Sequence, residues 1–239
     1  MLRTLVWIIG FLLLTAVLMF FTVRPLEAAA CPRCFGLTEL ASGVYGETGL
    51  SDEARQHTLQ TVAAAEERVG RFYGGLQHVP RVLACATPGC YRRIGGSGTR
   101  VGSVGTFTLM VSPEGMDVVL ISHELSHVEL HGRVGVLHMS AGAVPAWFDE
   151  GVAVLVSDDP VYLAPPRKGM ADRCTSGPTP DMPVEPGEWR DALQQEGEVM
   201  YARAACQVDL WMISKGGPAA VPALLAKVAG GEDFDAVYK

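Results

Sequence analysis

Basic residues are scarce in this sequence, and they do not gather in one place. The chain has 19 Lys and Arg against 26 Asp and Glu, which gives a formal net charge of -7. Proteins that bind nucleic acid neutralise phosphates with a basic face. The even scatter of Lys and Arg offers no such face, so we expect no nucleic acid partner.

Two further signatures are missing. The sequence shows no internal repeat, and its glycine-rich stretch "YRRIGGSGTRVGSVG" does not match the G-x-x-x-x-G-K-[ST] loop that holds phosphates. We expect this stretch to be a flexible hairpin or turn without phosphate chemistry. A length of 239 residues suits one domain of moderate size.

Charge is absent from Thr4 to Val23. At ~1.5 Å per residue this stretch is long enough to cross a hydrocarbon layer of ~30 Å as a helix. The rival interpretation is a cleaved signal peptide, since "LEAAAC" offers small residues at Ala28 and Ala30. We favour an uncleaved anchor, residues 1–24, that fixes the protein to the membrane with residues 25–239 in the periplasm or extracellular space. Cleavage would instead give a secreted or periplasmic protein.

The cysteines are even in number, and in an exported domain they predict three disulfides. The sequence alone leaves the connectivity open. A pairing of the last two would staple a proline-rich loop to a later helix. The alternative is a four-thiolate zinc site built from "CPRC" and "CATPGC". The six are Cys31, Cys34, Cys85, Cys90, Cys174 and Cys206.

The remaining pattern is a helix, then a small sheet, then more helices, which predicts an α+β fold. A helix should begin at a Ser51 cap, and "PRVLACA" and "GTFTLMVSP" should be strands. We expect later helices from about Met116 to His131, ended by Gly132, and over "VPAWFDEGVAVLVS" with Pro145 at its first position. Residues 157–197 hold 7 of the 15 prolines and predict a long loop. Helices should follow over about 198–214 and after residue 222.

The stretch "LISHELSHVELHG", residues 120–132, holds the residues that carry chemistry. On a helix, His123 and His127 project from one face, so their imidazoles can share one ion. Glu124 lies about 100° round the helix, where it can polarise a water beside that ion. The alternative is a set of core histidines hydrogen-bonded to the backbone or to one another.

A catalytic zinc ion normally takes three protein ligands, so a third donor is needed. Glu150 in "PAWFDEG" is our choice, because it lies on a second helix after a short connector. Trp147 and Phe148 should anchor that helix in the core, and Gly151 should let it approach the first. Asp149 competes for the role of ligand and otherwise should orient an imidazole.

Together, "HELSH" and "WFDEG" resemble the gluzincin zinc metallopeptidases, and most closely the bacterial peptidase-MA-like proteins, many of which are membrane-anchored or exported. The resemblance covers roughly residues 81–225 and implies a zincin-like fold, one Zn²⁺ per chain and a peptide or protein substrate. It implies that His123, His127 and Glu150 are the zinc ligands and that Glu124 is the general base. The 22-residue gap between His127 and Glu150 differs from that of the zinc aminopeptidases, so exopeptidase specificity is not implied.

Gluzincins commonly add a Tyr or His donor from a later helix, and here the resemblance points to Tyr201, whose alternative is a place at the core edge. We expect His131 to line the cleft or to bond a carboxylate. The function predicted is a zinc-dependent, endopeptidase-like hydrolase. The alternative is a catalytically silent envelope module that binds zinc, or nothing, and serves interaction or assembly.

Overall fold

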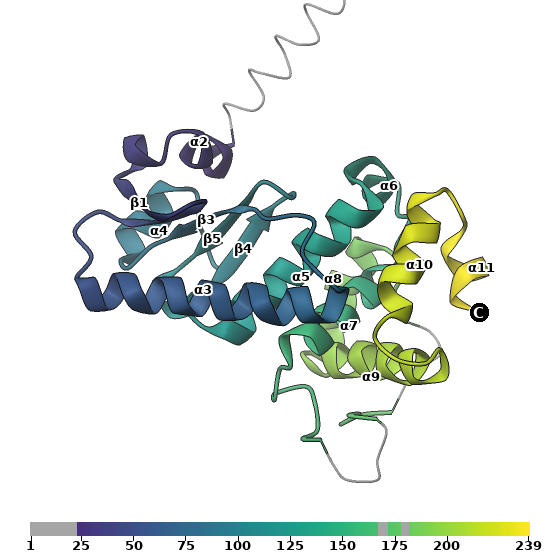
Figure 1. The fold of residues 1–239 in the computed structure, drawn as a ribbon. Helices are drawn as coiled ribbons and strands as arrows, with labels where there is room; N and C mark the ends of the chain where they lie inside the picture. Colours follow the sequence, from purple (N-terminus) through teal and green to yellow (C-terminus); the bar gives the residue numbers. More distant parts are fainter. Residues whose placement is uncertain (1–22, 167–171, 178–181) are drawn as a thin grey trace, which may run out of the picture. The chain divides into compact units, whose positions relative to one another are not determined.

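The computed structural model of the chain describes residues 23–166, 172–177 and 182–239 (Figure 1). The described residues form two compact units, one made of residues 23–59 and 80–116 and the other of residues 60–79 and 117–239 with the gaps named above. The first unit holds a small mixed sheet and the second is helical, which confirms the α+β class. A single domain over residues 25–239 stays a prediction.

The sheet of the first unit has five short strands in the order β1-β2-β3-β5-β4. The central pairs β2/β3 and β3/β5 are parallel, and the outer pairs β1/β2 and β4/β5 are antiparallel. Sequence patterns predicted only β3 and β5. The strands are β1 (Leu37–Ala41), β2 (Val44–Glu47), β3 (Arg81–Ala84), β4 (Val101–Val104) and β5 (Thr108–Val111).

Short helices complete the core of the first unit. Leu37, Leu83 and Met110 from the sheet pack with Ala28 and Ile94 from the helical segments. The glycine-rich stretch is more ordered than expected, since it contains the end of α4 and all of β4. The helices are α2 (Arg24–Ala30), η1 (Pro32–Phe35), α4 (Pro88–Arg93) and η2 (Pro113–Gly115).

Helix α3 (Asp52–Tyr73) belongs to both units, and the Ser51 hydroxyl accepts a hydrogen bond from the Ala54 N–H as its predicted cap. The helices not yet named lie in the second unit. They are α5 (Val118–Val134), α6 (Val136–Ser140), α7 (Ala146–Ser157), α8 (Pro186–Glu196), α9 (Val199–Ser214), α10 (Ala220–Ala229) and α11 (Phe234–Tyr238). Helix α8 falls within the stretch expected to be a loop and begins with a capping box of Glu185 and Glu188.

Helix α5 is longer than predicted at its C-terminal end. Asp117 caps its start, because its carboxylate accepts the N–H groups of Val119 and Leu120, and Gly135, with φ of 93°, follows its last residue. The predicted stop, Gly132, lies inside the helix instead. A Cβ there would lie 2.2 Å from the His78 ring, so this glycine allows close packing and does not terminate the helix.

Helix α7 packs between α5 and α9, with Phe148 fully buried and Trp147 nearly so, as predicted. Pro145 is the residue before the helix, one position earlier than expected. The close approach made possible by Gly151 is to α9 and not to α5. A Cβ at Gly151 would lie 2.5 Å from the Ala204 carbonyl oxygen.

All six cysteines form disulfides, in the pairs Cys31–Cys34, Cys85–Cys90 and Cys174–Cys206. Three disulfides are confirmed, and the four-thiolate zinc alternative is wrong because its sulfurs are bonded to one another. Stable disulfides are typical of extracellular or periplasmic proteins.

The Cys174–Cys206 bond should be the most stabilising of the three, because its cysteines are 32 residues apart. Closing a loop of that size restricts the unfolded chain and contributes about 3 to 4 kcal/mol. We expect Cys174→Ala with Cys206→Ala to lower the free energy of unfolding by this amount in a urea titration. The control pair Cys31→Ala with Cys34→Ala, which opens a much smaller loop, should cost about half as much. Equal losses would contradict the prediction.

The prediction of a single-pass membrane protein is corrected. In residues 23–166, 172–177 and 182–239, no helix has the length and apolar character needed to cross a bilayer. The first described helix, α2, has only seven residues and includes Arg24 and Glu27. The predicted span Thr4–Val23 lies, except for Val23, outside the described residues.

Candidate metal centre

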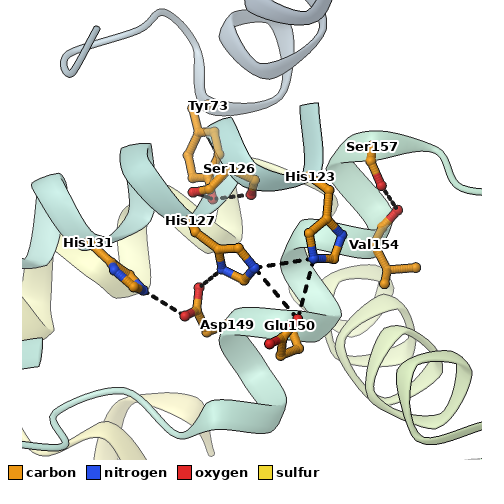
Figure 2. Close-up of polar contacts among 9 residues, drawn as sticks. All are labelled: Tyr73, His123, Ser126, His127, His131, Asp149, Glu150, Val154 and Ser157. Carbon is orange, nitrogen blue, oxygen red and sulfur yellow. Dashed lines mark hydrogen bonds and ion pairs between the residues drawn. The ribbon is translucent and has the colours of Figure 1, made fainter. Parts of the chain in front are cut away.

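Two imidazoles from α5 point to the same place (Figure 2). His123 and His127 are one helical turn apart, and their Nε2 atoms lie 3.2 Å from each other. Both side chains are mostly buried, at 19% and 13% exposed. The periodicity that suggested a shared ion therefore brings these two nitrogens together as predicted.

Helix α7 brings a carboxylate to the same point. The Oε2 atom of Glu150 lies 3.4 Å from His123 Nε2 and 3.5 Å from His127 Nε2 (Figure 2). This oxygen is buried, yet within the described residues it makes no hydrogen bond. Its neighbours there are the two imidazole nitrogens at ion-pair distance, and a bound cation between the three atoms would satisfy the lone pair that no hydrogen bond uses.

The three atoms fit one zinc-sized ion. Tetrahedral zinc with bonds of about 2.0–2.1 Å places its ligand atoms about 3.3–3.4 Å apart. The three separations here are 3.2, 3.4 and 3.5 Å, so the donors are spaced like three corners of such a tetrahedron. Two imidazoles and one carboxylate are also the donor types that catalytic zinc sites use.

Asp149, the neighbour of Glu150, does not join this group. Its Oδ1 lies 2.8 Å from His127 Nδ1, and its Oδ2 lies 2.7 Å from His131 Nε2 (Figure 2). An ionised carboxylate only accepts, so both imidazoles donate to it. A neutral His127 that donates from Nδ1 keeps the lone pair of Nε2 for a metal, as expected of an orienting partner.

The electrostatics of the centre match these contacts. Burial by itself raises the pKa of Glu150, but the neighbouring imidazoles, His127 above all, lower it to about 2. Burial likewise opposes ionisation of Asp149, yet His127 and His131 hold its pKa far below the ordinary value. Burial lowers the pKa of His127, whereas Asp149 and Glu150 together raise it well above the usual range. The lowered pKa values keep both carboxylates ionised at neutral pH. The raised pKa of His127 favours its protonated form before a metal binds, so a metal at Nε2 displaces that proton and leaves the neutral ring that donates from Nδ1.

A second group, His127, His131 and Asp149, also has donor atoms close enough together to hold a metal ion. Its contacts of 2.7 and 2.8 Å are hydrogen-bond distances and are shorter than the edge of a zinc tetrahedron. The geometry therefore favours hydrogen bonding in this group. His131 bonds a carboxylate, which was one of the two roles predicted for it.

Glu124 and Tyr201 complete the list of predicted site residues. Glu124 follows His123 on α5 and is half-buried. The ring of Tyr201, from α9, lies 6.3 Å from that of His123 and stacks on Tyr162 at 5.2 Å. Burial, and after it the charge of Glu150, raises the pKa of Tyr201, so its phenol stays protonated at neutral pH and can donate.

Sequence reasoning missed a buried ion pair on the far side of α5. Glu129 is fully buried, accepts the N–H groups of Gln77 and His78, and pairs with Arg133 at 2.6 Å. The i,i+4 spacing of Glu129 and Arg133 was the available signal. This spacing does not identify a buried pair, because exposed ion pairs on helices have the same spacing.

Comparisons with protein-family models, with curated proteins and with solved structures found no match to this chain.

Proposed function

We propose that this protein is a zinc-dependent hydrolase of peptide bonds, with one zinc ion held by His123, His127 and Glu150. The observation that carries the proposal is the set of three donor atoms spaced like the corners of a zinc tetrahedron, one of them a buried oxygen without a hydrogen bond to any described residue. Three protein ligands leave a fourth position for water or substrate.

Zinc bound to these atoms supplies a Lewis acid, which lowers the pKa of water and polarises a carbonyl group. The protein supplies the rest. His127 is held by the bond from its Nδ1 to Asp149, which keeps the Nε2 lone pair directed at the metal position. His123 on α5 and Glu150 on α7 supply the other two ligand atoms, and these two helices pack against each other.

Glu124 is the general base in this proposal. It lies next to His123 and about 100° round α5, so its carboxylate stands beside the ligand set and not within it. It takes the proton from the water that attacks the peptide carbonyl and passes it to the leaving amine. Pure metal binding has no need of a carboxylate at this position.

Tyr201 is the proposed donor to the oxyanion of the tetrahedral intermediate. Its phenol is protonated and its ring lies beside that of His123, so it can donate to negative charge that develops near the metal. Such a donor contributes a few kcal/mol to lowering a barrier. These roles agree with the resemblance of "HELSH" and "WFDEG" to the gluzincins, and we propose a zincin-like fold on the same ground.

Removal and return of the metal tests the proposal. The purified full-length chain, stripped with a chelator, should lose cleavage of a diverse peptide library. One equivalent of Zn²⁺ should restore cleavage, and Mg²⁺ should not, because magnesium prefers oxygen ligands. Cleavage that survives complete removal of zinc would contradict the proposal, and stoichiometric zinc without cleavage of any peptide would favour a silent binding module.

A further inference from the structure

His131 takes no part in the ligand set, but it is tied to that set through one carboxylate. It lies one turn beyond His127 on α5, and its Nε2 is 2.7 Å from Oδ2 of Asp149. The other oxygen of Asp149 lies 2.8 Å from Nδ1 of His127. Figure 2 shows the resulting chain of His131, Asp149 and His127, which ends at the His123 and Glu150 contacts.

The two hydrogen bonds of Asp149 together determine how its carboxylate is oriented. With only the bond to His127, the carboxylate is free to rotate about its terminal torsion, which is broad for Asp. A second bond, from His131 to the other oxygen, fixes the plane of the carboxylate. A fixed carboxylate holds the ring of His127 in one orientation and one tautomer.

His131 is the residue that bonds the second oxygen of Asp149. The side chain of Asp149 is 14% exposed, whereas that of His131 is 33% exposed, so His131 stands at the more open end of the chain. Among hydrogen bonds that join described residues, those of the Asp149 carboxylate go to His127 and His131. Without His131, the Asp149 carboxylate would keep only His127 as a hydrogen-bond partner among these residues.

We propose that His131 is a positioning residue for the metal centre: through Asp149 it fixes the orientation and tautomer of His127. This inference rests on the proposed function, since it assumes that His127 binds a metal ion through Nε2. It assigns a role to a residue outside the three ligands and the general base.

Cobalt binding tests the inference without any need for activity. Co²⁺ is added to the metal-free, full-length protein, and its affinity and visible absorption are measured. We expect His131→Leu to weaken Co²⁺ binding by about tenfold, the lower end of the range for outer partners of metal ligands. His131→Gln keeps an N–H donor of similar reach and should recover most of the affinity. The control His138→Ala, on α6, should leave affinity unchanged.

A double-mutant cycle shows whether His131 acts through Asp149. If it does, His131→Leu should have little further effect on Co²⁺ affinity once Asp149→Asn is present. Equal effects of His131→Leu in both backgrounds, or a loss of thermal stability in the metal-free protein without a loss of affinity, would overturn the inference. Binding of two Co²⁺ per chain, with one lost in His131→Leu, would show that His131 is a ligand and would also overturn it.

Failure of the inference is distinguishable from failure of the proposed function. If the wild type binds Co²⁺ and the His131→Leu variant binds it with the same affinity, only the role of His131 is wrong. If wild-type protein binds no Co²⁺, the metal centre itself is wrong, and the inference falls with it.

Discussion

Glu124→Gln should lower peptide hydrolysis by roughly 10²- to 10⁴-fold, which is the usual contribution of a positioned general base. Glutamine keeps the size and shape of the side chain but cannot accept the proton of the attacking water. The ligands His123, His127 and Glu150 are unchanged, so zinc content should stay near that of the wild type. The measurement is kcat on a cleaved peptide together with zinc analysis of the same sample.

A matched control is Glu232→Gln, the same change at an exposed position of the helical unit. It should leave both hydrolysis and zinc content unchanged. Full activity of Glu124→Gln would rule out the proposed mechanism. Loss of zinc in that variant would instead mean that Glu124 helps to hold the ion.

Arg133→Met should lower the free energy of unfolding by about 3 to 5 kcal/mol, the usual cost of leaving one charge of a buried ion pair without its partner. Glu129 is 0% exposed, and the guanidinium of Arg133 also donates to the carbonyl oxygen of Gly75 and packs over the Tyr73 ring. Removing Arg133 therefore leaves a buried carboxylate with only backbone N–H partners. Urea titration at neutral pH measures the loss.

The chain contains a control pair with the same spacing. Glu67 and Arg71 are also four residues apart and 2.7 Å from each other, but their side chains are 74% and 73% exposed. Arg71→Met should therefore cost less than about 1 kcal/mol. Because a buried pair is often replaced by apolar residues at little cost, Glu129→Met combined with Arg133→Met should recover part of the stability. Equal losses at the buried and exposed arginines would contradict this account.

Local patterns in the sequence were sufficient to predict which donor atoms of the candidate metal centre come together. His123 and His127 lie on one helical face whatever the rest of the fold, and "PAWFDEG" marks a second helix with buried aromatic residues on one side. Because α7 packs on α5, Glu150 meets the two imidazoles, as the sequence predicted. Asp149 and Glu150 are neighbours on α7 and point in different directions around it, so Asp149 bonds His127 and His131 while Glu150 meets the two Nε2 atoms.

Longer-range pairings were beyond the sequence. Strands β1, β2 and β4 have only four or five residues and no apolar run longer than two, so only their pairing in the sheet marks them as strands. Gly132 carries the sequence signal of a helix end, but contact with His78, more than 50 residues earlier, decides its role. Gly151 likewise predicted a close approach without showing that its neighbour would be Ala204 of α9.

Zinc analysis of the purified full-length protein tests the central claim most directly. The account predicts about one zinc per chain in the wild type, a strong loss of zinc in Glu150→Gln, and no loss in Glu232→Gln. A wild-type protein that takes up no zinc, or a Glu150→Gln variant that holds zinc as tightly as the wild type, would contradict the claim that these two imidazoles and this carboxylate bind one ion.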